Sequence, residues 1–133
     1  MREIDASHGE GGGQLLRTAM ALGAVTHTAL RLSHVRARRS KPGLAPQHLT
    51  AVRAVAALCG GTVEGLAIGS QEVVFQPGDL RGGAYDFDVG TAGSVPLVLQ
   101  ALLPAMVASG QRYDVRLTGG TDVWAAPPFD YLE

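Results

Sequence analysis

Residues 3–25 read EIDASHGEGGGQLLRTAMALGAV, which is a short strand pattern, a glycine-rich turn and a helix pattern in succession. Residues 3–6 predict the strand, and the glycines from Gly9 to Gly13 end it. In residues 14–25 the apolar side chains recur with helical spacing and form one face. A strand, a glycine turn and a helix in this order indicate the start of an α/β fold.

The following residues extend this start into a unit of the form βαβαββ. Residues 29–35 alternate between apolar and polar side chains, which predicts a second strand. A second helix is expected to begin near Pro46, because proline is favoured in a first helical turn, and to stop at the glycine pair 60–61. Two further strands are predicted at residues 62–66 and 72–75, joined by a glycine-containing turn.

The pattern then starts again, with a strand at residues 85–89, a glycine turn at 90–94 and a strand at 113–117. Between them lies a predicted helix that Ser94 caps. This helix is apolar nearly all round, which favours burial on several sides, and we expect Pro104 to kink it.

We therefore predict an α/β (α+β) fold of repeated βαβαββ units, of which about one and a half are present. Residues 1–80 form the first unit, and residues 81–133 form an incomplete second unit of the same domain. An incomplete unit favours a fragment or a truncated reading frame over an ordered C-terminal tail.

The composition is typical of a protein that folds into a compact domain, and the overall charge does not indicate what the protein binds. The 133 residues suffice for one small domain, and 46% of them are hydrophobic. The net charge is −1, so a nucleic-acid partner has to be inferred from local clusters. The single cysteine, Cys59, is expected to be a small buried apolar group. No signal peptide or membrane-spanning stretch is predicted, and we expect a cytoplasmic protein with no membrane partner.

The glycine turn of residues 8–14 is the first candidate site. Glycines allow backbone N–H groups to approach a ligand, and a helix N-terminus favours phosphate. The turn lacks the Gly-Lys-Ser/Thr ending of a Walker loop, and it lacks the acidic residue that a dinucleotide fingerprint places about 20 positions later. On its own it indicates a phosphate site or a tight structural turn in equal measure.

Two charged residues accompany this turn. Glu10 would repel a phosphate unless a metal lay between them, and its alternative role is charge complementarity at a helix start. Arg17 lies three residues after Gln14 and shares its helical face. Arg17 either lies at the solvent-exposed edge of the helix or binds a phosphate.

A cluster of cations follows the second predicted strand. Residues 36–41 hold four cations, among them Arg36, Arg39 and the only lysine of the chain. Arginine suits bidentate phosphate binding, and the Pro42-Gly43 turn would fix the cluster in space. The alternative is a solvated loop.

Three weaker candidates lie elsewhere. Gln47 and His48 come at the start of the second predicted helix, where His48 could bind phosphate or could be a surface or capping histidine. The glycine turn of residues 88–94 could bind another phosphate through its N–H groups. Pro127 and Pro128 could line an aromatic base or could stiffen a loop.

Taken in order, these segments resemble the RNA 3'-terminal phosphate cyclase family. The resemblance covers essentially the whole chain, and the ordered set is specific although each motif alone is weak. The motifs are GEGGGQLLR (9–17), VRARRSKPGL (35–44), QHLTAV (47–52), GTAGS (90–94) with LVLQ (97–100), GGTD (119–122) and APP (126–128).

The resemblance implies an ATP-dependent ligase that converts an RNA 3'-phosphate to a 2',3'-cyclic phosphate. In this family a histidine is first adenylated by ATP with a divalent metal, and AMP then moves to the RNA phosphate. The neighbouring 2'-hydroxyl attacks and expels AMP. Adenylation is needed because a phosphate monoester is a poor electrophile.

The same resemblance assigns roles to individual residues. Glu10 corresponds to the carboxylate of a Mg²⁺ or Mn²⁺ site. The residues that correspond to phosphate- or RNA-binding groups are Arg17, Arg36, Arg39, Gln47 and His48. Those that correspond to nucleotide-binding groups are Gln14, Pro127 and Pro128. Arg38 stands where we expect glycine and is given no role.

One part of the family pattern is absent. The adenylated histidine belongs to the C-terminal part of the family, and none of His8, His27, His34 and His48 matches it; His27 and His34 are expected at the surface. We therefore predict no catalytic nucleophile in this chain and no nucleotidyl transfer by it alone. An RNA with a 3'-phosphate end and a complementary C-terminal polypeptide are the candidate partners.

Two alternatives stay open. The chain could be a non-catalytic RNA-associated protein of the same family, or a truncated remnant that exposes apolar helix faces. Glu10, Arg17 and the Arg36/Arg39 pair favour the enzyme, because a scaffold has no need of a metal carboxylate.

Overall fold

Strands and helices alternate along the chain in the computed structural model, which describes residues 1–6, 13–37, 42–90, 95–119 and 121–125. The elements in order are β1 (Arg2–Asp5), α1 (Gly13–Thr26), β2 (Leu30–Ser33), α2 (Pro46–Cys59), β3 (Thr62–Glu64), β4 (Val73–Gln76), β5 (Gly83–Asp88), α3 (Val95–Ser109), β6 (Tyr113–Gly119) and β7 (Thr121–Ala125). The α/β fold class predicted from the sequence is confirmed.

The strands form two separate sheets. In the first sheet, of order β1-β2-β4-β3, β1 and β2 are parallel and the other pairs are antiparallel. In the second sheet, of order β5-β6-β7, β5 and β6 are parallel and β7 is antiparallel to β6. A parallel strand–helix–strand arrangement therefore occurs in both sheets, once around α1 and once around α3. The unit boundary at residue 80 stays a prediction.

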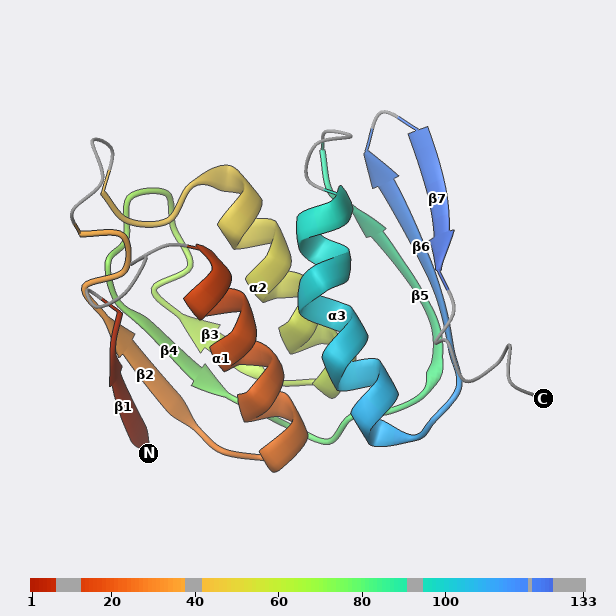
Figure 1. Ribbon diagram of the computed structural model, residues 1–133, viewed down its shortest axis with the longest axis horizontal. Helices are drawn as coiled ribbons and strands as arrows, with labels where there is room; N and C mark the ends of the chain where they lie inside the picture. The colour runs from red at the N-terminus through yellow and green to blue at the C-terminus, as the bar shows by residue number, and fades with distance from the viewer. Residues whose placement is uncertain (7–12, 38–41, 91–94, 120, 126–133) are drawn as a thin grey trace.

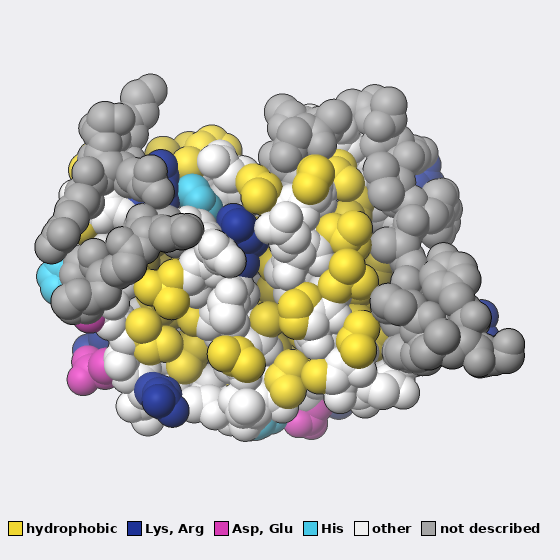
Figure 2. All heavy atoms as spheres, in the orientation of Figure 1, with side chains coloured by type: hydrophobic (Ala, Val, Ile, Leu, Met, Phe, Trp, Pro, Cys, Tyr) yellow, Lys and Arg dark blue, Asp and Glu magenta, His cyan; other side chains and the backbone are white. Residues whose placement is uncertain are grey.

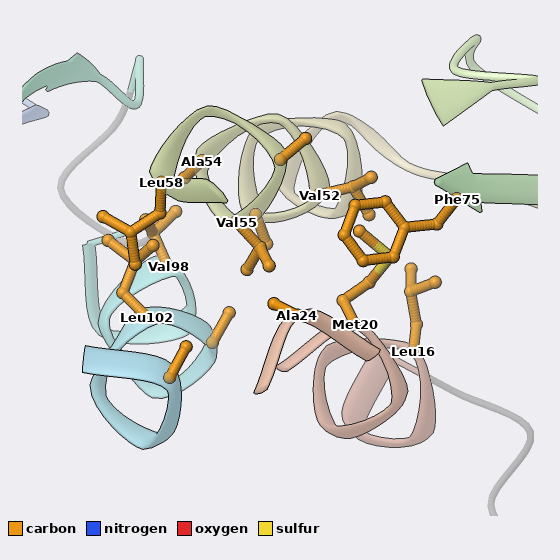
Figure 3. Packing of buried hydrophobic residues seen from close by; sticks show 14 of the residues in the cluster. Leu16, Met20, Ala24, Val52, Ala54, Val55, Leu58, Phe75, Val98 and Leu102 are labelled. Atoms are coloured by element: carbon orange, nitrogen blue, oxygen red, sulfur yellow. The ribbon is translucent and has the colours of Figure 1, made fainter. Parts of the chain in front are cut away.

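The three helices lie between the two sheets, with α1 and α2 against the first sheet and α3 against the second (Figure 1). Their facing sides bury small and medium apolar residues (Figure 3). The residues at the centre are Leu16, Met20 and Ala24 of α1, Val52, Val55 and Leu58 of α2, and Val98 and Leu102 of α3. Phe75 of β4 closes this core toward the first sheet.

Helix α3 explains why the second sheet stays attached to the first. It contacts α1, α2 and β6, which confirms the predicted burial on several sides. The helix runs unbroken past Pro104, whose side chain is exposed. Proline cannot donate to the carbonyl of Gln100, and Gln100 is also exposed, so that carbonyl lies on the solvent side. The kink at Pro104 stays a prediction.

The helix ends follow the local sequence. Pro46 lies in the first turn of α2, and Gly60 ends this helix with φ 62°, the left-handed conformation that glycine adopts without strain. Cys59 is buried and its thiol donates to the Ala56 carbonyl at 3.6 Å, as expected of an apolar structural cysteine.

Strand β7 was not predicted from the sequence. After β6 the chain reverses direction, so that Gly119 pairs with Thr121 and β7 runs antiparallel to β6. The available signal was the presence of strand-favouring residues, Thr121, Val123 and Trp124, in this short stretch. Among the described residues, no helix is long and apolar enough to cross a membrane. The cytoplasmic location stays a prediction.

Candidate phosphate-binding site

The three helices run side by side and begin at the same end of the molecule (Figure 1). The aligned backbone dipoles of the helices place partial positive charge at this end. None of the three helices has an acidic residue in its first turn that would neutralise this charge. The shared end is therefore suited to bind an anion.

Gly13, the first residue of α1, brings two nitrogen-bearing side chains together. A Cβ atom at Gly13 would lie 2.5 Å from Nε2 of His48 and 2.6 Å from Nη1 of Arg17. Both side chains therefore pack directly against the start of α1, where a side chain larger than hydrogen would displace them. The start of α1, the Arg17 guanidinium and the buried His48 ring therefore lie together.

His48 is held at this position by the backbone at the start of α2. It is the third residue of α2, and its Nδ1 accepts the Ala45 N–H at 3.0 Å. Ala45 has no side-chain acceptor, so only this reciprocal half of a capping box forms. Because Nδ1 accepts a proton, neutral His48 carries its own proton on Nε2, the atom that faces Gly13. Of the roles left open for His48 by the sequence, the capping contact is formed here, and its role in phosphate binding stays a prediction.

The alternative of a surface histidine is wrong for His48. Only 5% of this residue is exposed, because the start of α1 covers its ring. Its neighbour Gln47 is half-buried, and Gln14 at the start of α1 is exposed. His27 and His34 are exposed, as predicted, and lie 3.3 Å from Asp79 and Asp5 respectively.

Replacing His48 by alanine is expected to destabilise the fold by about 2 kcal/mol, because the Ala45 N–H loses its acceptor and a buried ring leaves a cavity. His48→Gln is the matched control, since glutamine at this helix position also reaches back to the N-cap N–H and should cost less than about 1 kcal/mol. Urea unfolding followed by circular dichroism measures both. Equal losses for the two variants would contradict the capping role.

Arg36 closes the loop that leads into α2. Its Nη1 donates to the Gly43 carbonyl at 2.7 Å. The loop is also fixed to the β3–β4 connection, because Leu44 donates to Ser70 at 2.9 Å and accepts from Gly69 at 2.8 Å. The loop is thus anchored and not merely solvated around Pro42-Gly43. A role of Arg36 in phosphate binding stays a prediction.

The remaining predicted site residues lie outside the described part of the chain. They are Glu10, Arg39, Pro127 and Pro128. The second glycine turn, at residues 91–94, also falls outside it. Within the described residues, no group of three or more His, Cys, Asp or Glu side chains could hold a metal ion. The metal site at Glu10 therefore stays a prediction.

The special position of Gly13 was not predicted. The sequence distinguished it from Gly11 and Gly12 only by its place next to the helix pattern. Its tight contact with His48 depends on a residue 35 positions later, so no local signal could have identified it.

A separate hollow of about 440 Å³ lies at the other end of α2. Its lining includes Gly60, Asp79, Arg81 and Tyr85. Burial, followed by the nearby Tyr113, raises the pKa of Tyr85, whose hydroxyl donates to the Arg81 carbonyl at 2.7 Å. A neutral hydroxyl with this partner joins β5 to the preceding loop, so its evident role is structural.

The fold and the site together define an α/β protein whose three helices begin at one end, a location suited to bind an anion. The model of the family described as RNA 3'-terminal phosphate cyclase matches residues 8–133. The chain belongs to this family. This is the family that the order of its sequence motifs indicated.

Curated relatives from bacteria and archaea carry the name RNA 3'-terminal phosphate cyclase. The chain is 63% identical to that of Nitrosospira multiformis over 132 residues, which are 99% of this chain and 37% of the relative. It is 54% identical to that of Pyrococcus furiosus over 129 residues, 97% of this chain and 38% of the relative. For Archaeoglobus fulgidus the figures are 52% over 133 residues, 100% of this chain and 40% of the relative. The chain thus spans well under half the length of these relatives and corresponds to their N-terminal portion.

Proposed function

We propose that this chain contributes the phosphate-binding part of an ATP-dependent RNA 3'-phosphate cyclase. The observation that carries the proposal is the packing of Arg17 and His48 against Gly13 at the common start of the helices. The nucleophilic histidine is then supplied by the portion of the family fold that this chain does not include. The substrates are ATP and an RNA with a 3'-phosphate end.

The chemistry requires such a surface. Transfer of AMP to an RNA 3'-phosphate brings two anions together, and the repulsion between them has to be offset by fixed positive charge and hydrogen-bond donors. The Arg17 guanidinium is a permanent cation, and a hydrogen bond from a charged group to phosphate is stronger than one between neutral groups. His48 is buried beneath the start of α1, where its bond with the Ala45 N–H holds the ring, so it supports this surface from within. These groups are in place before a ligand binds, so little reorganisation is needed.

A divalent cation would assist phosphate binding in this part of the proposed site. We propose Glu10 as the carboxylate that binds Mg²⁺ or Mn²⁺, which would neutralise phosphate charge. Arg36, Arg39, Gln47 and Gln14 are proposed as further polar contacts, and Pro127 and Pro128 as the wall of the adenine pocket.

The test is an adenylation assay with the chain, ATP labelled in the α-phosphate, a divalent metal and a 3'-phosphorylated RNA. It is run with and without a co-expressed polypeptide corresponding to the C-terminal portion of the family. We expect labelled protein and cyclised RNA only when both polypeptides are present. Arg17→Ala should abolish cyclisation in this mixture, whereas Arg53→Ala, an exposed arginine further along α2, should not.

Two results would contradict this proposal. Cyclised RNA from the chain alone would show that the nucleophile lies within these residues. Absence of label in the mixture, with RNA still bound, would instead favour a non-catalytic RNA-associated role.

A further inference from the structure

The connection between β3 and β4 is longer than the pairing of the two strands requires. The strands end and begin at Glu64 and Val73, and residues 65–72 connect them. Two residues can join antiparallel strands in a tight hairpin, so these eight are more than the pairing needs. Figure 1 shows the connection, drawn in light green, beside the segment that leads into α2. The extra length thus brings the connection to the start of that helix.

One stretch of this connection holds both ends of the loop between β2 and α2. Before the loop, the Val35 N–H donates to the Gln71 carbonyl at 3.0 Å. After the loop, the Leu44 N–H donates to the Ser70 carbonyl at 2.9 Å, and the Leu44 carbonyl accepts the Gly69 N–H at 2.8 Å. Three consecutive residues of the connection therefore support the loop where it begins and where it ends.

The connection is fixed by hydrogen bonds of its own. The Ala67 N–H donates to the Gly65 carbonyl at 3.0 Å, and the Ser70 N–H donates to the Ala67 carbonyl at 3.1 Å. The Ser70 hydroxyl donates to the Glu72 carbonyl at 2.9 Å. A segment held by such bonds resists displacement, so it can fix the position of the loop that it contacts.

Two side chains depend on the loop that is held in this way. Arg36 donates from Nη1 to the Gly43 carbonyl at 2.7 Å, and Gly43 lies in close contact with the backbone of Gly69. Ala45 is the N-cap of α2, and its N–H donates to Nδ1 of His48 at 3.0 Å. Figure 2 shows cationic side chains gathered at the end of the molecule where α1 and α2 begin. A shift of the connection would therefore move both side chains at this end.

We propose that the β3–β4 connection is a positioning element for the phosphate site. It holds Arg36 through Gly43 and holds His48 through the start of α2, and it does not contact the phosphate itself. Hydrogen bonds from charged groups to phosphate are short and directional, so a small displacement of the guanidinium weakens them. The inference rests on the proposed function, because the groups that are positioned are those of the proposed phosphate site.

The first experiment shortens the connection. Residues 66–72 are replaced by Asn-Gly, which closes a two-residue hairpin and keeps Glu64 opposite Val74. The hydrogen bonds from the connection to the loop are then lost while β3 and β4 stay paired. Fluorescence anisotropy measures the affinity for matched RNAs that end in 3'-phosphate and 3'-hydroxyl. We expect the preference for the phosphate end to fall about tenfold or more.

A milder variant serves if the shortened chain does not fold. Ser70→Ala removes the hydrogen bond from the serine hydroxyl to the Glu72 carbonyl and leaves the backbone hydrogen bonds in place. The connection is then less firmly fixed, and the preference for the phosphate end should fall about threefold. An unchanged preference in Ser70→Ala and in the shortened chain would overturn the proposal.

Two control variants separate positioning from a loss of stability. Ile68→Ser changes a side chain of the connection that is 70% exposed and leaves its backbone as it is. Gly78→Ala places a Cβ against the Cys59 carbonyl, at the opposite end of α2, and so destabilises the fold away from the site. Both should keep the preference for the phosphate end, because a smaller folded fraction lowers the binding of both RNAs alike. An equal fall in Gly78→Ala would make stability the cause and contradict the positioning role.

The second experiment follows amide hydrogen exchange without a ligand. The Ala45 N–H is bonded to His48, and the Val89 N–H is bonded to the Thr118 carbonyl in the second sheet, where it serves as the reference. In the shortened chain the Ala45 amide should exchange at least about tenfold faster relative to the Val89 amide, because the start of α2 can open locally. Gly78→Ala should leave this ratio unchanged.

The two experiments distinguish this proposal from the proposed function. If the wild-type chain prefers the phosphate end and the shortened chain prefers it equally, the positioning role is wrong and the proposed function stands. If the wild-type chain binds the two RNAs alike but the Ala45 amide loses its protection, the connection holds the start of α2 and the proposed function fails. An unchanged exchange ratio at Ala45 in the shortened chain would show that the connection does not hold this helix start.

Discussion

Replacing Gly13 by alanine is expected to lower the affinity for a 3'-phosphorylated RNA about tenfold or more. The new Cβ would lie 2.5 Å from His48 Nε2 and 2.6 Å from Arg17 Nη1, so both side chains have to move. His48 is buried and tied to Ala45, and it has little freedom to adjust. A tenfold loss corresponds to about 1.4 kcal/mol, the scale of one hydrogen bond to a charged group.

The control for this variant lies in the same helix. Gly23→Ala introduces the same methyl group, which crowds the Leu30 side chain and not the helix start. Alanine has a higher helix propensity than glycine, so neither change weakens α1 through its backbone. Fluorescence anisotropy with matched RNAs ending in 3'-phosphate and 3'-hydroxyl isolates the contribution of the phosphate. If Gly13→Ala and Gly23→Ala bind the two RNAs alike, Gly13 is not part of a phosphate site.

Replacing Gly43 by alanine is expected to destabilise the fold by about 3 kcal/mol or more. Gly43 has φ 85°, and a Cβ there would overlap the backbone carbonyl of Gly69. The hydrogen bonds between Leu44 and the backbone of Gly69 and Ser70 would have to break to relieve that overlap. The loop that carries the predicted arginines would then lose its anchor.

Gly69→Ala separates the two causes of this loss. Gly69 has φ 83°, almost the same backbone conformation, but among the described residues no atom beyond its two chain neighbours lies within 4 Å of the Cβ position. The free energy of unfolding of this variant should fall only by the cost of placing alanine in the left-handed conformation, about 1–2 kcal/mol. Guanidinium chloride unfolding of both variants provides the comparison. Equal destabilisation would show that the contact with Gly69 contributes nothing and that the backbone conformation alone matters.

The local elements were predictable because their signals are local. The alternation in β2, the apolar spacing in α1 and α2, and the Pro46 and Gly60 boundaries depend on side chains a few positions apart. Strand β7 was missed because the glycines at its start predicted a turn more strongly than five following residues predicted a strand. Its pairing with β6 supplies hydrogen bonds that local propensity does not include.

The candidate site, too, was predictable from the sequence only in part. The residue types, the glycine turn and the order of the motifs indicated a phosphate-binding protein and its family, and the match over residues 8–133 confirms the family. Burial of His48 could not be predicted, because it depends on the start of α1 lying over a ring 35 positions later in the chain. The anchoring of Gly43 on Gly69, 26 positions away, is equally non-local.

The sequence by itself determined the α/β class, most of the elements and the family, since periodicity, glycine and proline positions and motif order are properties of neighbouring residues. Only the tertiary structure decided that all three helices begin at one end and that Arg17 and His48 meet at Gly13. These features arise when two sheets enclose one helical layer, and packing between distant segments, not local conformation, sets them.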